Sequence, residues 1–197
     1  MKTLNRNFQY LRLRGSGKKG YLKLSRLEHR QRTVTRTFRI GEEWDKILQE
    51  EAAREGLSVN VLVNRILRRY AIFDRWADRF GTVALTPRTF RGILESAIED
   101  GLARAGRSSG SDIINVFDEM GLPANLNSFA YLIEEFLGGQ GFARWFRGSH
   151  HDQGGEQLFH LQHDFGRGWS LYLQEYFQSC LRSLNVNDVD SRVYELS

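Results

Sequence analysis

The chain has 197 residues, of which 41% are hydrophobic and 12% aromatic, a composition typical of a globular protein with one or two domains. Its single cysteine, Cys180, excludes a disulfide framework within the chain, and no apolar run reaches the roughly 20 residues of a membrane helix. The net charge of +4 is uneven: residues 1–32 carry +9, residues 33–73 carry +1 and residues 74–197 carry −6. We therefore expect a cytoplasmic protein whose N-terminal part meets a polyanion.

Residues 1–32 are expected to form a flexible basic arm. Glycines and lysines at 15–20 make a polar linker, flanked by segments 8–14 and 21–27 that alternate only weakly between apolar and polar residues. These segments predict either a hairpin across the glycines or no stable structure.

Residues 33–40, TVTRTFRI, predict a short strand whose two faces differ. The polar face holds Thr33, Thr35, Thr37 and Arg39. The other face, mostly apolar and expected to be buried, holds Val34, Arg36, Phe38 and Ile40.

Two helices are predicted after this strand. Acidic residues after Gly41 favour a helix start, and apolar residues then recur at helical spacing until Gly56, which is expected to end a helix of about fourteen residues. Ser58 is expected to cap a second, longer helix whose apolar stripe runs over 59–70 and which continues to about residue 80. A lone strand with two helices buries little apolar surface, so this segment predicts a dimer with paired strands.

The order of elements in TRTFRIGEEWDKILQEEAAREGLSVNVLVNRILRRY resembles the ribbon-helix-helix family of prokaryotic DNA-binding proteins, the Arc and methionine-repressor group. The resemblance rests on the alternating strand, the GEEW helix start and the Gly56–Asn60 turn, and it implies a ribbon-helix-helix module over residues 33–75. Arg36 departs from the family, which usually has an aliphatic residue there. Arg36 either reaches outward at the end of the ribbon or the strand register is shifted by one residue.

The resemblance implies that a two-stranded ribbon enters the major groove of double-stranded DNA. The base-reading positions of the family correspond to Thr35, Thr37 and Arg39. The alternative for these three residues is an ordinary solvated strand face.

The same resemblance implies phosphate contacts beside the ribbon. Backbone N–H groups at the start of the second helix, at Ser58, Val59 and Asn60, would hold a phosphate. Arg30 and Arg32 would add salt-dependent affinity. Arg65, Arg68 and Arg69 are expected on a solvated helix face.

Residues 76–197 are expected to form an α+β domain with a small antiparallel sheet. The pattern predicts a strand at 82–85, a helix from Pro87 to Ala105, a loop at 106–110, helices at 112–120 and 127–137, a helix over 169–184 and a closing strand at 191–197. The two glycines at 154–155 predict a hairpin, and we place His151 opposite Glu156 in it. Asp164 or Ser170 is expected to cap the last helix, and Cys180 to be buried and inert.

Four histidines, His150, His151, His160 and His163, raise the question of a metal site. In the hairpin register above, His150 and His163 lie at opposite ends of one face, so we expect no metal site within one chain. Neighbouring His163 and Asp164 point to opposite sides of a strand and do not form a catalytic relay. We expect no cofactor and no enzymatic activity.

The sequence thus predicts a nucleoid-associated, repressor-like transcriptional regulator that binds double-stranded DNA as a homodimer or a higher oligomer. The C-terminal domain would bind a small-molecule or protein effector, or serve oligomerisation. Two alternatives stay open: an antitoxin-like module that masks a protein partner and regulates its own synthesis, and a ligand-processing enzyme in the C-terminal domain.

Overall fold

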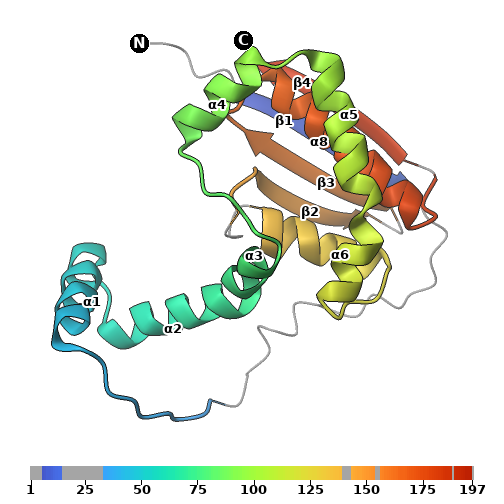
Figure 1. Ribbon diagram of the computed structural model, residues 1–197. Helices are drawn as coiled ribbons and strands as arrows, with labels where there is room; N and C mark the ends of the chain where they lie inside the picture. The colour runs from blue at the N-terminus through green and yellow to red at the C-terminus, as the bar shows by residue number, and fades with distance from the viewer. Residues whose placement is uncertain (1–5, 15–32, 139–142, 154–155, 188, 197) are drawn as a thin grey trace. The chain divides into compact units, whose positions relative to one another are not determined.

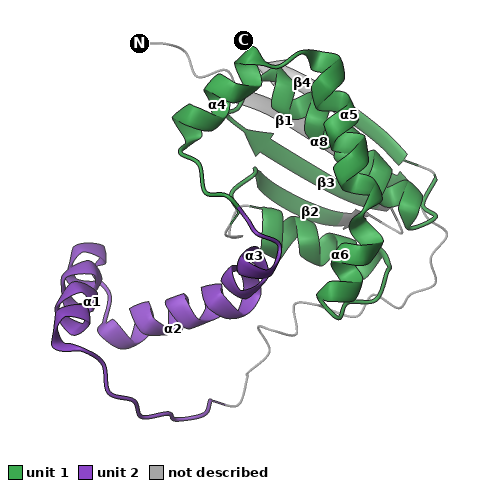
Figure 2. Ribbon diagram, in the orientation of Figure 1, with its two compact units in different colours: residues 1–22, 83–197 green, residues 23–82 purple. Residues whose placement is uncertain are grey.

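The computed structural model of the chain describes residues 6–14, 33–138, 143–153, 156–187 and 189–196. The chain divides into two compact units, which Figure 2 shows in different colours. Residues 23–82 form a helical unit, and residues 1–22 together with 83–197 form a sheet unit. The expected combination of helices with a small antiparallel sheet is confirmed. Within the described residues, no helix combines the length and apolar character needed to cross a bilayer.

The helical unit contains the predicted pair of helices. Its elements are α1 (Glu42–Glu55), α2 (Val59–Arg69), the π-helical turn η2 (Tyr70–Asp74) and α3 (Arg75–Arg79). Gly56 ends α1 with a left-handed φ of 67°, and Ser58 caps α2 by accepting the Val61 N–H at 3.3 Å. The helix end at Gly56, the helix start at Ser58 and the continuation of the second helix toward residue 80 are all confirmed.

The sheet unit has four antiparallel strands in the order β2-β3-β1-β4, visible in Figure 1. Their bounds are β1 Arg6–Arg14, β2 Arg147–Gln153, β3 Glu156–His163 and β4 Val189–Leu196. β2 and β3 form the predicted hairpin, but His151 lies opposite Leu158 rather than Glu156. The connection is shorter than expected, with Gln153 opposite Glu156. Each residue keeps its predicted face, because the register moves by an even number of positions.

Strand β1 is the main departure from the expected arm over residues 1–32. Residues 6–14 pair with β3 on one side and with β4 on the other, so they form an inner strand of the sheet. Leu11 and Leu13 are almost fully buried, which explains why this weakly alternating stretch is ordered. The rest of the expected arm, with its glycine linker, lies outside the described residues.

The helices of the sheet unit are α4 (Pro87–Ser96), α5 (Glu99–Ser111), α6 (Ile113–Glu119), α7 (Leu126–Tyr131), the π-helical η3 (Leu132–Leu137) and α8 (Arg167–Ser183). No strand forms at 82–85, and the single helix expected from Pro87 breaks at Ala97–Ile98. Gly166, with a φ of 82°, precedes α8 in place of the side-chain cap expected from Asp164 or Ser170. Cys180 is fully buried, and burial raises the pKa of its thiol to about 12, as the expectation of an inert thiol requires.

The loop expected at residues 106–110 is wrong, because these residues lie within α5. A Cβ atom at Gly106 would lie 2.4 Å from the Tyr172 carbonyl oxygen, and one at Gly110 would lie 2.3 Å from that of Tyr176. The two glycines therefore allow the backbones of α5 and α8 to approach closely. In Figure 1, α8 and α5 lie in successive layers on one side of the sheet.

Candidate nucleic-acid interface

The predicted base-reading residues lie on an extended segment in front of α1. Thr35, Thr37 and Arg39 are all exposed, as is the rest of residues 33–40. No strand is assigned to this segment in the described single chain. The predicted ribbon needs a second chain, so its strand pairing stays a prediction.

The apolar residues of this segment are also exposed. The exposed fraction is 67% for Val34, 60% for Phe38 and 41% for Ile40. In a soluble protein, three large apolar side chains at alternating positions of one short segment are expected to find a cover. Among the described residues of the helical unit, none covers these three side chains.

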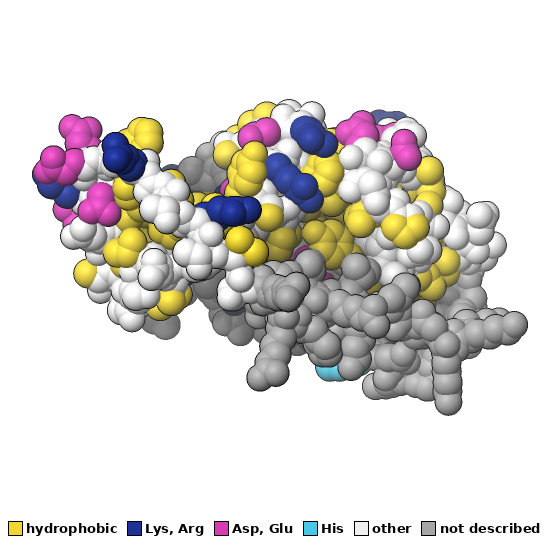
Figure 3. Space-filling view, turned by 90° about the horizontal axis from the view of Figure 1, so that it is seen from below, with side chains coloured by type: hydrophobic (Ala, Val, Ile, Leu, Met, Phe, Trp, Pro, Cys, Tyr) yellow, Lys and Arg dark blue, Asp and Glu magenta, His cyan; other side chains and the backbone are white. Residues whose placement is uncertain are grey.

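The apolar stripe of α2 is covered only near its start. Leu62 is 5% exposed, whereas Ile66, Leu67 and Tyr70 on the following turns are 45%, 54% and 57% exposed. Figure 3 shows hydrophobic side chains at the surface on the left of the view, where Figure 1 has α1 and α2. The helix therefore leaves most of its apolar face exposed.

The turn between α1 and α2 is fixed by local hydrogen bonds. The N–H of Leu57 donates to the Ala52 carbonyl at 2.8 Å, and the N–H of Leu62 donates to the Ser58 carbonyl at 3.1 Å. Ser58 and Asn60 are exposed and Val59 is half-buried, so the start of α2 is open on one side. Arg30 and Arg32 lie outside the described residues.

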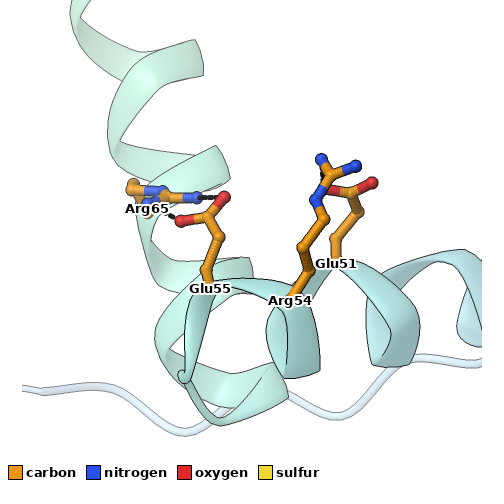
Figure 4. Close-up of polar contacts among 4 residues, drawn as sticks. All are labelled: Glu51, Arg54, Glu55 and Arg65. Atoms are coloured by element: carbon orange, nitrogen blue, oxygen red, sulfur yellow. Dashed lines mark hydrogen bonds and ion pairs between the residues drawn. The ribbon is translucent and has the colours of Figure 1, made fainter.

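Arg65 has a role that the sequence analysis missed. Its guanidinium donates two hydrogen bonds to the Glu55 carboxylate, at 2.6 and 2.7 Å, and thereby joins α2 to the end of α1 (Figure 4). This hydrogen-bonded pairing lowers the pKa of Glu55 and raises that of Arg65. Nearby, Arg54 pairs with Glu51 within α1. The residues of the Glu55–Arg65 pair are ten apart, a spacing with no signature in the sequence.

His150 and His163 lie at opposite ends of one face of the hairpin, as expected. His150 stacks on Phe159 with ring centroids 4.4 Å apart and contacts Glu134 at 2.8 Å and Gln157. His163 lies beyond the other end of the paired segment, past the Arg147–Gln162 pair. Among the described residues no group of three or more candidate metal ligands gathers.

His163 and Ser170 do meet, in contrast to the capping role expected of Ser170. The two residues are 3% and 1% exposed, and His163 Nε2 lies 3.1 Å from Ser170 Oγ. The N–H of Phe165 donates to His163 Nδ1 at 3.3 Å, so the neutral ring carries its proton on Nε2 and donates it to Ser170. Burial lowers the pKa of His163 to about 4. A neutral ring that donates its Nε2 proton is not arranged to accept the Ser170 proton, and the hydrogen bond ties the end of β3 to the first turn of α8.

The Asp164 carboxylate turns away from this pair. It accepts a hydrogen bond from Arg147 at 3.0 Å, while the Asp164 carbonyl accepts one from Arg91 at 2.7 Å. Asp164 thus ties α4 and β2 to the end of β3. This geometry agrees with the expectation that His163 and Asp164 do not form a relay.

Comparisons of the chain with family models, with curated proteins and with solved structures found no match.

Proposed function

We propose that the helical unit is one half of a symmetric DNA-binding dimer of the ribbon-helix-helix type, and that the chain is a sequence-specific transcriptional regulator. The exposed apolar surface of this unit carries the proposal: Phe38 on the extended segment, Ile66 and Leu67 on α2, and Tyr70 at the start of η2 are all at least 45% exposed. A unit of about sixty residues, with few buried side chains among its described residues, is marginal by itself. A second copy covers both sets when the extended segments pair antiparallel and the α2 helices pack together.

The proposed ribbon reads bases through the polar positions of the extended segment. Pairing of two segments through their backbones leaves Thr35, Thr37 and Arg39 of each chain on one face. Arg39 can donate two hydrogen bonds to the O6 and N7 atoms of guanine, and the threonines can bond to bases and contact the thymine methyl group. A two-stranded ribbon fits the width of the major groove.

The start of α2 positions the ribbon on the DNA backbone. Val61 and Leu62 already donate to Ser58, whereas the N–H groups of Val59 and Asn60 come too early in the helix for an intrahelical acceptor. These two groups, with the helix dipole behind them, suit a phosphate oxygen. Arg30 and Arg32 would add salt-dependent affinity.

The sheet unit serves in this proposal as the effector-binding or oligomerising part of the regulator. The dimer represses by occupying a promoter, and an effector changes its affinity for DNA. This assignment rests on the organisation of the chain into two units.

Selection of fragmented genomic DNA by the purified protein at physiological salt tests the proposal. The wild type is expected to enrich discrete sites with two-fold symmetric half-sites. Arg39→Ala and Thr37→Ala are each expected to weaken binding to such a site by about 1–3 kcal/mol. The combined Thr35, Thr37 and Arg39 alanine variant should lose the sites and still sediment as a dimer.

Arg54→Ala is the matched control, because Arg54 is an exposed arginine of the same unit that lies on α1 rather than on the ribbon. It removes the same charge and should keep the selected sites. If wild type and triple variant enrich the same fragments, or neither enriches any, the base-reading assignment is refuted. A monomeric wild type at micromolar concentration would refute the ribbon itself.

A further inference from the structure

The last helix of the helical unit, α3, carries two arginines that lie over one tryptophan. The guanidinium carbon of Arg75 lies 4.4 Å from the centroid of the Trp76 ring, and that of Arg79 lies 4.9 Å from it. Both distances fall within the range of a cation–π interaction, which is strongest with tryptophan. Trp76 is 6% exposed and stacks on Phe80 with ring centroids 6.4 Å apart. The tryptophan is therefore a fixed support that orients two guanidinium groups close together.

These two arginines are exposed and make no ion pair with a carboxylate in the described parts of the chain. The acidic residue just before them, Asp74, pairs instead with Arg69 at 3.0 Å across the π-helical turn η2. Asp78, which stands between the two arginines in the sequence, is exposed and joins neither of them in an ion pair. By contrast, Arg54 and Arg65 of the same unit each bind a glutamate. The two arginines over the tryptophan thus keep their positive charges unmatched within the described structure.

Two oriented guanidinium groups without an acidic partner suit an oxyanion. Each group presents its N–H donors in a planar fork that matches two oxygens of a phosphate group. The tryptophan ring offers no acceptor oxygen, so the N–H groups of both arginines keep most of their hydrogen-bonding capacity. Because the ring already orients the two side chains, a ligand costs them less conformational entropy on binding than it would cost two unsupported arginines.

We propose that Arg75 and Arg79 form a binding site for the phosphate group of a small phosphate monoester. Such a group carries a charge of about −1.5 to −2 near pH 7, which matches the two positive charges of the arginines. A backbone phosphate of DNA carries a single negative charge and would leave one of the two arginines unmatched. The charge balance therefore favours a monoester over a nucleic-acid backbone as the occupant of this site.

The site is separate from the phosphate contact proposed at the start of α2. The elements α2, η2 and α3 follow one another directly, and Figure 1 shows them as one continuous run. Arg75 therefore lies about 24 Å beyond Val59 along a helix that rises about 1.5 Å per residue. The negative end of the helix dipole near Arg79 opposes an anion, but at an exposed helix end this effect is smaller than one charge-assisted hydrogen bond. With two guanidinium groups donating, the attraction prevails.

Titration of the full-length protein with glucose 6-phosphate, followed by the arginine Nε–H signals in NMR spectra, tests the proposal. The signals of Arg75 and Arg79 should shift together and saturate with a Kd of about 1 mM or lower. Dimethyl phosphate, which carries the single charge of a DNA backbone phosphate, should bind more weakly. Arg75→Gln and Arg79→Gln should each weaken binding by about tenfold, because each removes a charge-assisted contact. Arg75→Lys should weaken it as well, because lysine keeps the charge but lacks the planar fork. Circular dichroism confirms that each variant folds.

Arg54→Gln is the matched control, because Arg54 is an exposed arginine of the same unit that pairs with Glu51; this variant should bind glucose 6-phosphate like the wild type. The combined alanine variant of the proposed ribbon should also keep this binding, and Arg75→Gln should keep the selected genomic sites, so the two proposals fail separately. The monoester site is overturned if the wild type does not bind glucose 6-phosphate, or if dimethyl phosphate binds as tightly. It is also overturned if folded Arg75→Gln and Arg79→Gln bind as tightly as the control.

Discussion

Replacing Gly106 by alanine tests the packing of α5 on α8 directly. In an ordinary helix this change is stabilising, because alanine has a helix propensity about 1 kcal/mol better than glycine. Here the new Cβ would lie 2.4 Å from the Tyr172 carbonyl oxygen and 3.1 Å from Glu175 Cβ. The nearest obstacle is backbone, which cannot rotate away, so the two helices must separate by about 1 Å to restore a normal contact distance.

The expected result is a net loss of stability. Overpacking of a close contact costs about 1–3 kcal/mol, and more where backbone must move, so after the gain in propensity the sheet unit should lose about 2 kcal/mol in its free energy of unfolding. The separation would also strain the hydrogen bond from Ser179 Oγ to the Arg107 carbonyl, 2.9 Å long, and the ion pair between Arg107 and Glu175, 3.0 Å long.

Gly92→Ala in α4 is the matched control, because a Cβ atom there would meet nothing within 4 Å. This variant should gain up to about 1 kcal/mol. The chain has four tryptophans spread over both units, so hydrogen exchange of the α5 and α8 amides is the better assay for this unit. If Gly106→Ala protects these amides as well as Gly92→Ala does, the close approach of the two helices is refuted.

Three further predictions follow from individual contacts. Burial lowers the pKa of His163 to about 4, so below pH 6.5 the unfolded chain binds a proton more readily than the folded protein does. The free energy of unfolding should therefore fall by on the order of 3 kcal/mol between pH 6.5 and pH 4. Urea unfolding of His163→Gln should show a smaller loss over the same range. The pKa of Glu55 is lowered, so its pairing with Arg65 stabilises the helical unit above the pKa of the unfolded carboxyl group, and this stabilisation is lost as pH falls through the folded pKa. Arg65→Gln should lower the melting temperature at pH 7 and leave it unchanged at pH 2. An equal effect at both pH values would contradict the pairing. Cys180, with a pKa of about 12 and no exposure, should react with a thiol reagent at pH 8 only on unfolding; rapid labelling of the folded protein would show that this part of α8 is open.

Local signals located several elements of this protein well. The acidic start after Gly41, the left-handed Gly56 and the cap at Ser58 depend on residues within one turn of the chain, and each was predicted at its observed position. The hairpin followed from two glycines between alternating segments, and the apolar stripe of α8 predicted burial of Cys180. Propensity and periodicity act over a few residues, so the sequence displays them directly.

Where the predicted secondary structure was wrong, contacts between segments distant in the sequence were the cause. Residues 106–110 predict a loop because glycine and serine are poor helix formers. They are helical because only glycine at 106 and 110 lets the backbone of α5 approach that of α8 so closely. Ser170 looked like a cap, yet the fold brings His163 within hydrogen-bond distance of it. The candidate base-reading residues Thr35, Thr37 and Arg39 rest on alternation and on the family resemblance; the single chain leaves them exposed, and their role stays a prediction.

The sequence by itself determined the α+β class and the helix pair with its turn. Only the tertiary structure decided that β1 joins a sheet whose other strands come more than 130 residues later, between Arg147 and Leu196. It also decided that the Glu55–Arg65 pair joins the two helices. Pairing of distant strands is set by which apolar faces can be buried together, and this is a property of the whole fold rather than of any short stretch of chain.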